Sequence, residues 1–217
     1  MIDRCDTVPP MSSTRGHRDE AAVTFGDVTD ATAQHAAAPR TTLPGLRRWN
    51  VGVGAAHLVQ AIVVLLLSND FAIAVESTVQ TGPPGTELTL EKVFFDLPFA
   101  PVIAVFLLFA AVDHLSMASP KLVGWYEANL VQGINPARWA EYSISASLMV
   151  VLIAMLPGIT NLYALIGIFA VNTAMILFGW LMERENPPGR PVTWWPFWFG
   201  CIVGAVPWIA ITIALVV

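Results

Sequence analysis

The 217-residue sequence has few charged side chains. Asp, Glu, Lys and Arg together make up 12% of it, against about 25% in a soluble domain, and hydrophobic residues make up 55%. This scarcity excludes an ordinary soluble protein and predicts an all-α integral membrane protein. The net charge of −5 offers no basic surface, so we expect no nucleic-acid partner.

Cysteine and lysine are also scarce. Cys5 lies near the N-terminus and Cys201 lies in an apolar segment, so they cannot build a disulfide framework or a Cys-x-x-Cys metal site. The lysines are Lys92 and Lys121, and both fall in segments that we expect to be loops.

Residues 1–42 form a separate polar region. They are rich in Asp, Arg, Thr, Ala and Pro and lack the continuous apolar core of a signal peptide. Burial of so few apolar groups cannot offset the entropy lost on ordering, so we expect a disordered tail. Residues 43–217 then form the membrane domain.

Five apolar segments follow the tail. Each has roughly the 20 residues that a helix needs to cross a bilayer, where every backbone amide must be satisfied internally. The predicted transmembrane helices span about 49–68, 97–119, 138–156, 162–182 and 194–217.

Basic residues set the expected orientation. Arg47 and Arg48 precede the first span, Lys121 lies in the loop after the second, and Arg184 and Arg190 lie in the loop after the fourth. These loops are on one side, which the positive-inside rule assigns to the cytoplasm. We therefore expect a multi-pass cell-membrane protein, surrounded by lipid, with a cytoplasmic N-terminus and an outside C-terminus.

The first outside loop, about residues 69–96, is unusually long. Two runs rich in Thr, Val and Leu, residues 75–81 and 86–91, flank a Gly-Pro-Pro-Gly turn at 82–85. This pattern predicts a β-hairpin.

Four ionisable side chains lie within the predicted spans, where such groups are costly and point to function. They are His57, Asp113, His114 and Glu141. His57 shares one helical face with Asn50 and Gln60, which must point into the bundle or a water-filled cavity. The alternative is a hydrogen-bonded packing histidine.

Glu141 and Ser145 are one turn apart on the third span. A carboxylate there needs a cation, a proton or a hydrogen-bond donor. Arg138 can supply the cation from the same helix, or a cation can come from another helix. Asp113 and His114 are adjacent and point about 100° apart, so we expect that both cannot fully face one cavity, and which one faces inward stays open.

Several stretches occur together in a characteristic order, and on them the chain resembles the heliorhodopsins. They are Arg47-Arg-Trp-Asn50, His57-Leu-Val-Gln60, Phe95-Asp-Leu-Pro98, Ala137-Arg-Trp139, Glu141-Tyr-Ser143, Met175-Ile-Leu-Phe-Gly179, Pro196-Phe-Trp-Phe-Gly-Cys201 and Val206-Pro-Trp208. The resemblance covers about Arg47 to the C-terminus.

This resemblance implies a seven-helix rhodopsin-like bundle that binds retinal and senses light, without pumping ions and without enzymatic activity. Glu141 matches the counterion of the protonated retinal Schiff base, and His57 and His114 match the pair that lines a cytoplasmic-side cavity. Tyr142, Ser143, Ser145 and Asn172 belong by the same resemblance to the cofactor's surroundings. The resemblance also implies a homodimer and a hairpin in the first outside loop; it names no signalling partner.

The sequence departs from the family in one respect. The family has seven helices and a retinal-binding lysine in the seventh, whereas this sequence has five spans and carries Lys92 and Lys121 in loops. Covalent retinal attachment is therefore not expected, because a Schiff base needs an amine within bonding distance of the aldehyde. We expect a chain truncated after the fifth helix; the alternatives are helices supplied by another chain or a five-helix relative without chromophore.

Two other functions compete with light sensing. One is a membrane interaction protein that uses the same scaffold without a chromophore. The other is an intramembrane metal-dependent hydrolase, since His57, His114, Asp113 and Glu141 are ligand types that suit zinc. The hydrolase is disfavoured because these residues come from three helices and lack the local spacing of a His-Glu-x-x-His motif.

Overall fold

The computed structural model describes residues 43–86 and 89–217. The tail expected at 1–42 lies outside the described residues. Five helices in the described part are long and apolar enough to cross a membrane, which confirms the five predicted spans. They are α2 (Leu43–Leu66), α3 (Phe99–Met117), α5 (Pro136–Met155), α6 (Leu162–Glu185) and α7 (Trp195–Val216).

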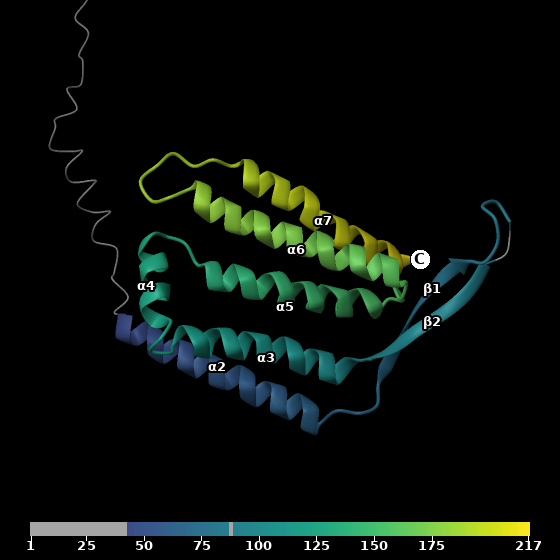
Figure 1. The fold of residues 1–217 in the computed structure, drawn as a ribbon, viewed down its shortest axis with the longest axis horizontal. Coiled ribbons are helices and arrows are strands. Elements are labelled where there is room, and N and C mark those ends of the chain that lie inside the picture. Colours follow the sequence, from purple (N-terminus) through teal and green to yellow (C-terminus); the bar gives the residue numbers. More distant parts are fainter. Residues whose placement is uncertain (1–42, 87–88) are drawn as a thin grey trace, which may run out of the picture. The chain divides into compact units, whose positions relative to one another are not determined.

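The five helices form a row in which chain neighbours pack together. Figure 1 shows the order α2, α3, α5, α6, α7, and each consecutive pair is in contact. Glycines allow close approach at several of these contacts. Gly54 of α2 lies against Leu115 of α3, and Gly179 of α6 lies against Trp139 of α5.

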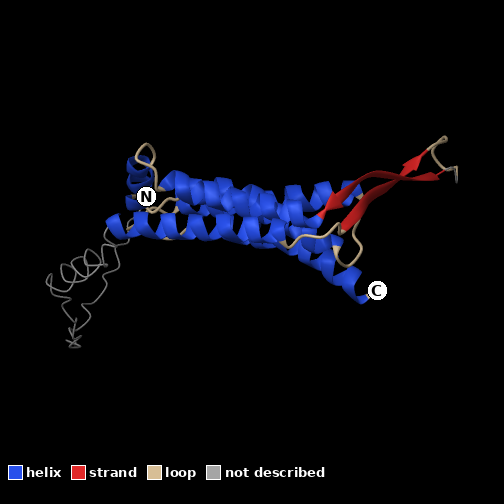
Figure 2. Ribbon diagram, turned by 90° about the horizontal axis from the view of Figure 1, so that it is seen from below, coloured by secondary structure: helices blue, strands red, loops and turns tan. Residues whose placement is uncertain are grey.

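The predicted hairpin is confirmed. Strands β1 (Ala72–Gln80) and β2 (Thr89–Pro98) form a two-stranded hairpin (Figure 2). They pair antiparallel, with a register shift between Val75 and Glu76. β2 is longer than predicted and takes up Leu97 and Pro98, which the sequence placed in the second span. Lys92 lies in β2, within the connection between the first two spans where the sequence placed it.

The hairpin is anchored to the loop between α5 and α6. The backbone N–H of Glu76 donates to the carbonyl of Thr160 at 3.1 Å, and the Thr160 hydroxyl donates to the Glu76 carboxylate at 3.0 Å. Next to them, Asn161 Nδ2 donates to Ser77 Oγ at 2.9 Å. Three polar contacts therefore fix the base of the hairpin to the bundle.

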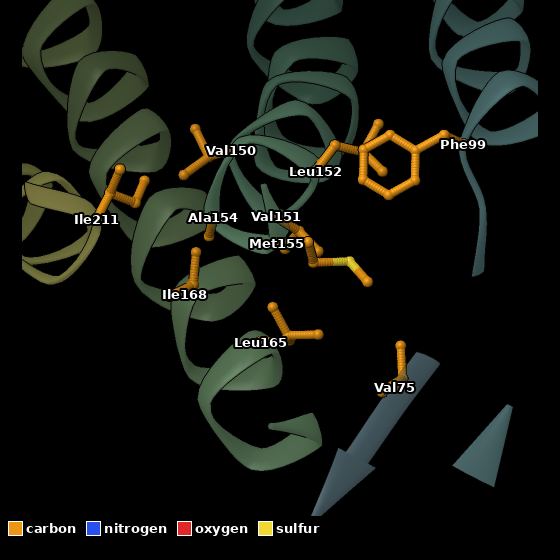
Figure 3. Packing of buried hydrophobic residues seen from close by; sticks show 10 residues of the cluster. All are labelled: Val75, Phe99, Val150, Val151, Leu152, Ala154, Met155, Leu165, Ile168 and Ile211. Carbon is orange, nitrogen blue, oxygen red and sulfur yellow. The ribbon is translucent and has the colours of Figure 1, made fainter. Parts of the chain in front are cut away.

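The apolar core lies at the hairpin end of the bundle. Figure 3 shows side chains of β1, α3, α5, α6 and α7 meeting there: Val75, Phe99, Val150, Val151, Leu152, Ala154, Met155, Leu165, Ile168 and Ile211. This cluster joins the hairpin to the four helices that contribute to it.

A short helix that the sequence analysis missed closes the opposite end. Helix α4 (Val123–Val131) lies between α3 and α5, within a segment that we expected to be a loop (Figure 1). Its nine residues are too few to span a bilayer. Its buried side chain is Tyr126, which points into the cavity described next.

Candidate functional site

A cavity of about 360 Å³ opens at the α4 end of the bundle. Helices α2, α3, α4 and α5 all contribute to its wall. Its polar lining residues are Asn50, His57, Asp113, His114, Tyr126, Asn135, Arg138, Glu141, Tyr142 and Ser145. All four ionisable residues predicted within the spans therefore meet around one space.

Two histidines stack in this cavity. The rings of His57 and His114 are nearly parallel, 14° apart, with centroids separated by 5.9 Å. His57 Nδ1 donates to Gln60 Oε1 at 3.0 Å, and His114 Nδ1 donates to Asn50 Oδ1 at 3.1 Å. The hydrogen-bonded packing role and the cavity-lining role thus occur together at His57.

Asp113 and His114 both line the cavity. Which of the two faces inward was left open by the sequence, and the structure has both contribute to the lining. The cavity reaches from α2, which His114 contacts through Asn50, to α5, which carries Glu141.

Glu141 has Ser145 as its immediate polar partner. The two side chains lie one turn apart on α5 and both line the cavity, and Ser145 is buried. Asp113 and His57 line the same cavity as Glu141. Ser145 alone cannot neutralise a carboxylate at membrane depth, so this position favours a cation or a proton beside it.

Arg138 does not supply that cation. Its guanidinium forms an ion pair with Glu183 at the last turn of α6 and lies over the Trp139 ring, 4.6 Å from the centroid. Glu183 also accepts from the backbone N–H of Asn135 at 2.9 Å and from Trp139 Nε1 at 2.6 Å. Of the two sources weighed for Glu141, a cation from elsewhere fits the geometry better.

Sequence reasoning missed Glu183. The sequence did contain a signal for this pair. When two antiparallel helices are joined by a short loop, the last turn of the second helix lies beside the first turn of the first helix. Arg138 stands in the first turn of α5 and Glu183 in the last turn of α6. Because these two turns lie side by side, the opposite charges of Arg138 and Glu183 predict an ion pair between α5 and α6.

One family model covers most of the chain. The model described as Heliorhodopsin matches residues 46–217, which include all five spans and the hairpin. The chain belongs to the heliorhodopsin family. No curated protein matches it.

This heliorhodopsin is a multi-pass, rhodopsin-like membrane protein, and the intact family contains retinal. Part of the cavity fits such a group. Glu141 offers a carboxylate without a fixed cation to the positive end of a protonated Schiff base. Among the described residues no lysine lines the cavity, since Lys92 lies in β2 and Lys121 follows α3.

The other predicted site residues fall into two groups. Tyr142 and Ser145 join Glu141 at the cavity, whereas Ser143 and Asn172 do not line it. The carbonyl of Ser143 accepts from the Thr173 hydroxyl at 2.9 Å, and Asn172 Nδ2 donates to Ser147 Oγ at 3.1 Å. In this heliorhodopsin they belong to a buried polar contact between α5 and α6.

Among the described residues, no group of three or more His, Cys, Asp or Glu side chains is arranged to hold a metal ion. The four ligand-type side chains of the cavity lie around its wall without converging on one point. No geometry in this part of the chain therefore supports the hydrolase alternative.

Proposed function

We propose that this heliorhodopsin is a light sensor in which Glu141 is the counterion of a protonated retinal Schiff base. The observation that carries the proposal is that Glu141 lines the cavity while Arg138, the nearest fixed cation on its own helix, is paired with Glu183. An unpaired carboxylate at membrane depth is costly unless a cation or proton joins it. When bound, retinal supplies a light-driven isomerisation and a cationic nitrogen.

The rest of the cavity gives the counterion its surroundings. Ser145 lies one turn from Glu141 on α5 and lines the same cavity, where its hydroxyl can donate to the carboxylate. His57 and His114 lie across the same space, and each has Nδ1 engaged with an amide oxygen, so Nε2 of a neutral ring is free to accept a proton. These groups place proton acceptors around one cavity, which suits a sensor whose cofactor exchanges a proton with its surroundings.

The test uses the chain with a soluble amine. The Schiff base of all-trans retinal with n-butylamine is added to purified protein in liposomes, so that no lysine is required. We expect a protein-dependent visible band, shifted to longer wavelength, because Glu141 stabilises the protonated form. Glu141→Gln should remove the shift. Glu127→Gln, on α4 and outside the cavity, should keep it.

Two results would overturn the proposal: the same spectrum with and without protein, or the same band in wild type and Glu141→Gln. Circular dichroism of each variant establishes that it retains its helices. The homodimer and the cytoplasmic N-terminus stay predictions. Cross-linking in membranes tests the first, and labelling of single cysteines introduced into the α3–α4 loop tests the second.

A further inference from the structure

The loop between α6 and α7 is held in one shape by the side chain of Asn186. Its Oδ1 accepts from the backbone N–H of Thr193 at 2.5 Å, and its Nδ2 donates to the carbonyl of Thr193 at 3.1 Å. A further bond from Nδ2 to the carbonyl of Met182, at 2.8 Å, ties the amide to the last turn of α6. One side chain therefore closes the two ends of the loop on each other.

The residues inside this closure restrict the loop further. Pro187, Pro188 and Pro191 each have a fixed φ angle. Gly189 turns the chain with a φ of 84°, which side chains other than glycine rarely allow. Pro188 also packs on the turn between α4 and α5, since a Cβ on Gly133 would lie 3.3 Å from its Cγ. The loop is therefore rigid before any partner binds.

This rigid loop presents a cation. Arg190 follows Gly189 and is exposed, and within the described part of the chain it forms no ion pair. Residues 186–200 include no Asp or Glu. The charged residues just before the loop, Arg184 and Glu185, are opposite in sign and balance each other. The surface between α6 and α7 therefore has a net positive charge.

An aromatic groove of about 520 Å³ begins two residues after Arg190. It is lined by Val192, Thr193, Trp194, Trp195 and Trp198. Each of the three tryptophans is more than half exposed, and among the described residues none of their indole N–H groups has a hydrogen-bond partner. The Phe197 ring contacts both Trp194 and Trp198 edge-on, with centroids 5.6 and 5.5 Å apart, and supports the groove wall.

The position and the chemistry of this groove together select its occupant. The apolar span of α7 begins at Trp195, so the groove lies at the level of the lipid headgroups, where tryptophan is typical. A guanidinium can bind a phosphate through two parallel hydrogen bonds, and an indole combines an apolar ring with an N–H donor. A small soluble anion would use Arg190 alone, whereas a phospholipid uses the cation and the aromatic wall.

We propose that the α6–α7 loop and the first turn of α7 form a binding site for an anionic phospholipid. Arg190 binds the phosphate, and Trp194, Trp195 and Trp198 pack against the glycerol and the start of the acyl chains. Asn186 is a positioning residue, because a loop that is already ordered loses little entropy on binding. The site involves neither the cavity nor retinal, so it stands or falls independently of the counterion role.

The first experiment compares two lipids. The full chain is purified in a nonionic detergent and titrated with dioleoylphosphatidylglycerol or dioleoylphosphatidylcholine, and native mass spectrometry counts the bound lipid. One phosphatidylglycerol per chain should bind roughly fivefold more tightly than phosphatidylcholine, the usual effect of one basic residue on an anionic lipid. Equal binding of the two lipids overturns the proposal. Displacement of phosphatidylglycerol by an equal concentration of inorganic phosphate also overturns it, because the site would then be one for a free anion.

A charge variant and its matched control then locate the site. Arg190→Gln should weaken phosphatidylglycerol binding roughly fivefold and leave phosphatidylcholine binding unchanged. Lys121→Gln removes an equal charge from the α3–α4 loop and should leave the affinity for both lipids unchanged. Equal losses in the two variants would show a general electrostatic effect and overturn the site, as would an unchanged affinity in Arg190→Gln.

Asn186→Ala tests the role of the loop's shape. It keeps every charge and every aromatic ring but removes the bonds to Thr193 and Met182. The affinity for phosphatidylglycerol should fall roughly two- to tenfold, because the loop must then be ordered when the lipid binds. Circular dichroism establishes that the variant retains its helices. An unchanged affinity would overturn the positioning role of Asn186.

Discussion

His114 donates a hydrogen bond from Nδ1 to Oδ1 of Asn50 at 3.1 Å, and this bond joins α3 to α2 at the cavity wall. Asn50 is 7% exposed, so little water competes for its amide. The bond places the proton of a neutral His114 ring on Nδ1 and leaves Nε2 as the acceptor. It also holds the ring in its stacked position over His57.

Asn50→Ala should lower the free energy of unfolding by about 1–3 kcal/mol, because a partly buried N–H of His114 loses its acceptor. Thermal unfolding in detergent, followed by circular dichroism, measures the change. Asn129→Ala is the matched control, since Asn129 bonds to the carbonyl of Trp125 within α4. Equal shifts in the two variants would argue against a stabilising role for the α2–α3 bond.

Glu183→Gln should destabilise the bundle by about 1–3 kcal/mol. The amide keeps the shape of the side chain but loses the charge that holds the Arg138 guanidinium and strengthens the bonds from Asn135 and Trp139. Glu185→Gln, exposed at the same end of α6, is the control and should change stability by less than about 0.5 kcal/mol. Trp139 fluorescence should respond in the first variant and not in the second.

Gly179→Ala and Gly167→Ala should have opposite effects although both positions lie inside α6. A Cβ at Gly179 would overlap the Trp139 ring, and we expect a loss of about 1–3 kcal/mol from overpacking. A Cβ at Gly167 meets no heavy atom within 4 Å, so higher helix propensity should add about 0.5–1 kcal/mol. Unfolding in a detergent series measures both changes in stability. If both variants were stabilised, or both destabilised, the result would contradict the close α5–α6 contact.

Asn161→Ala should weaken two features at once. Asn161 Oδ1 accepts from the N–H groups of Tyr163 and Ala164 and so caps α6, while its Nδ2 holds Ser77 of β1. The lost cap should cost about 1 kcal/mol. Ser77→Ala removes the hairpin contact alone. Hydrogen exchange should therefore speed up in β1 in both variants, and in the first turn of α6 in Asn161→Ala only.

Much of the fold was predictable because membrane insertion leaves a strong local signal. A run of about 20 apolar residues must be helical in lipid, and all five such runs became helices with ends shifted by a few residues. The hairpin was predictable from its Gly/Pro turn and flanking Thr/Val runs. Helix α4 was missed because nine residues between two spans carry no such length signal.

The site was less predictable than the fold. Helical periodicity correctly placed Asn50 and His57 on one face of α2, since the spacing of two residues along a helix fixes the angle between their side chains. It could not say that Asp113 and His114 share a cavity, because that depends on the width of the space between α2 and α5. It also left the partner of Arg138 open, and the structure places Glu183 there.

The sequence by itself determined the membrane class, the five spans, the hairpin and the presence of a carboxylate at membrane depth. These follow from local composition, because a backbone in lipid has few ways to satisfy its amides. Only the tertiary structure decided that Arg138 pairs with Glu183, that Ser143 and Asn172 are not part of the cavity lining, and that Asp113 lines the same cavity as Glu141. Those relationships depend on distances between helices, which no single segment encodes.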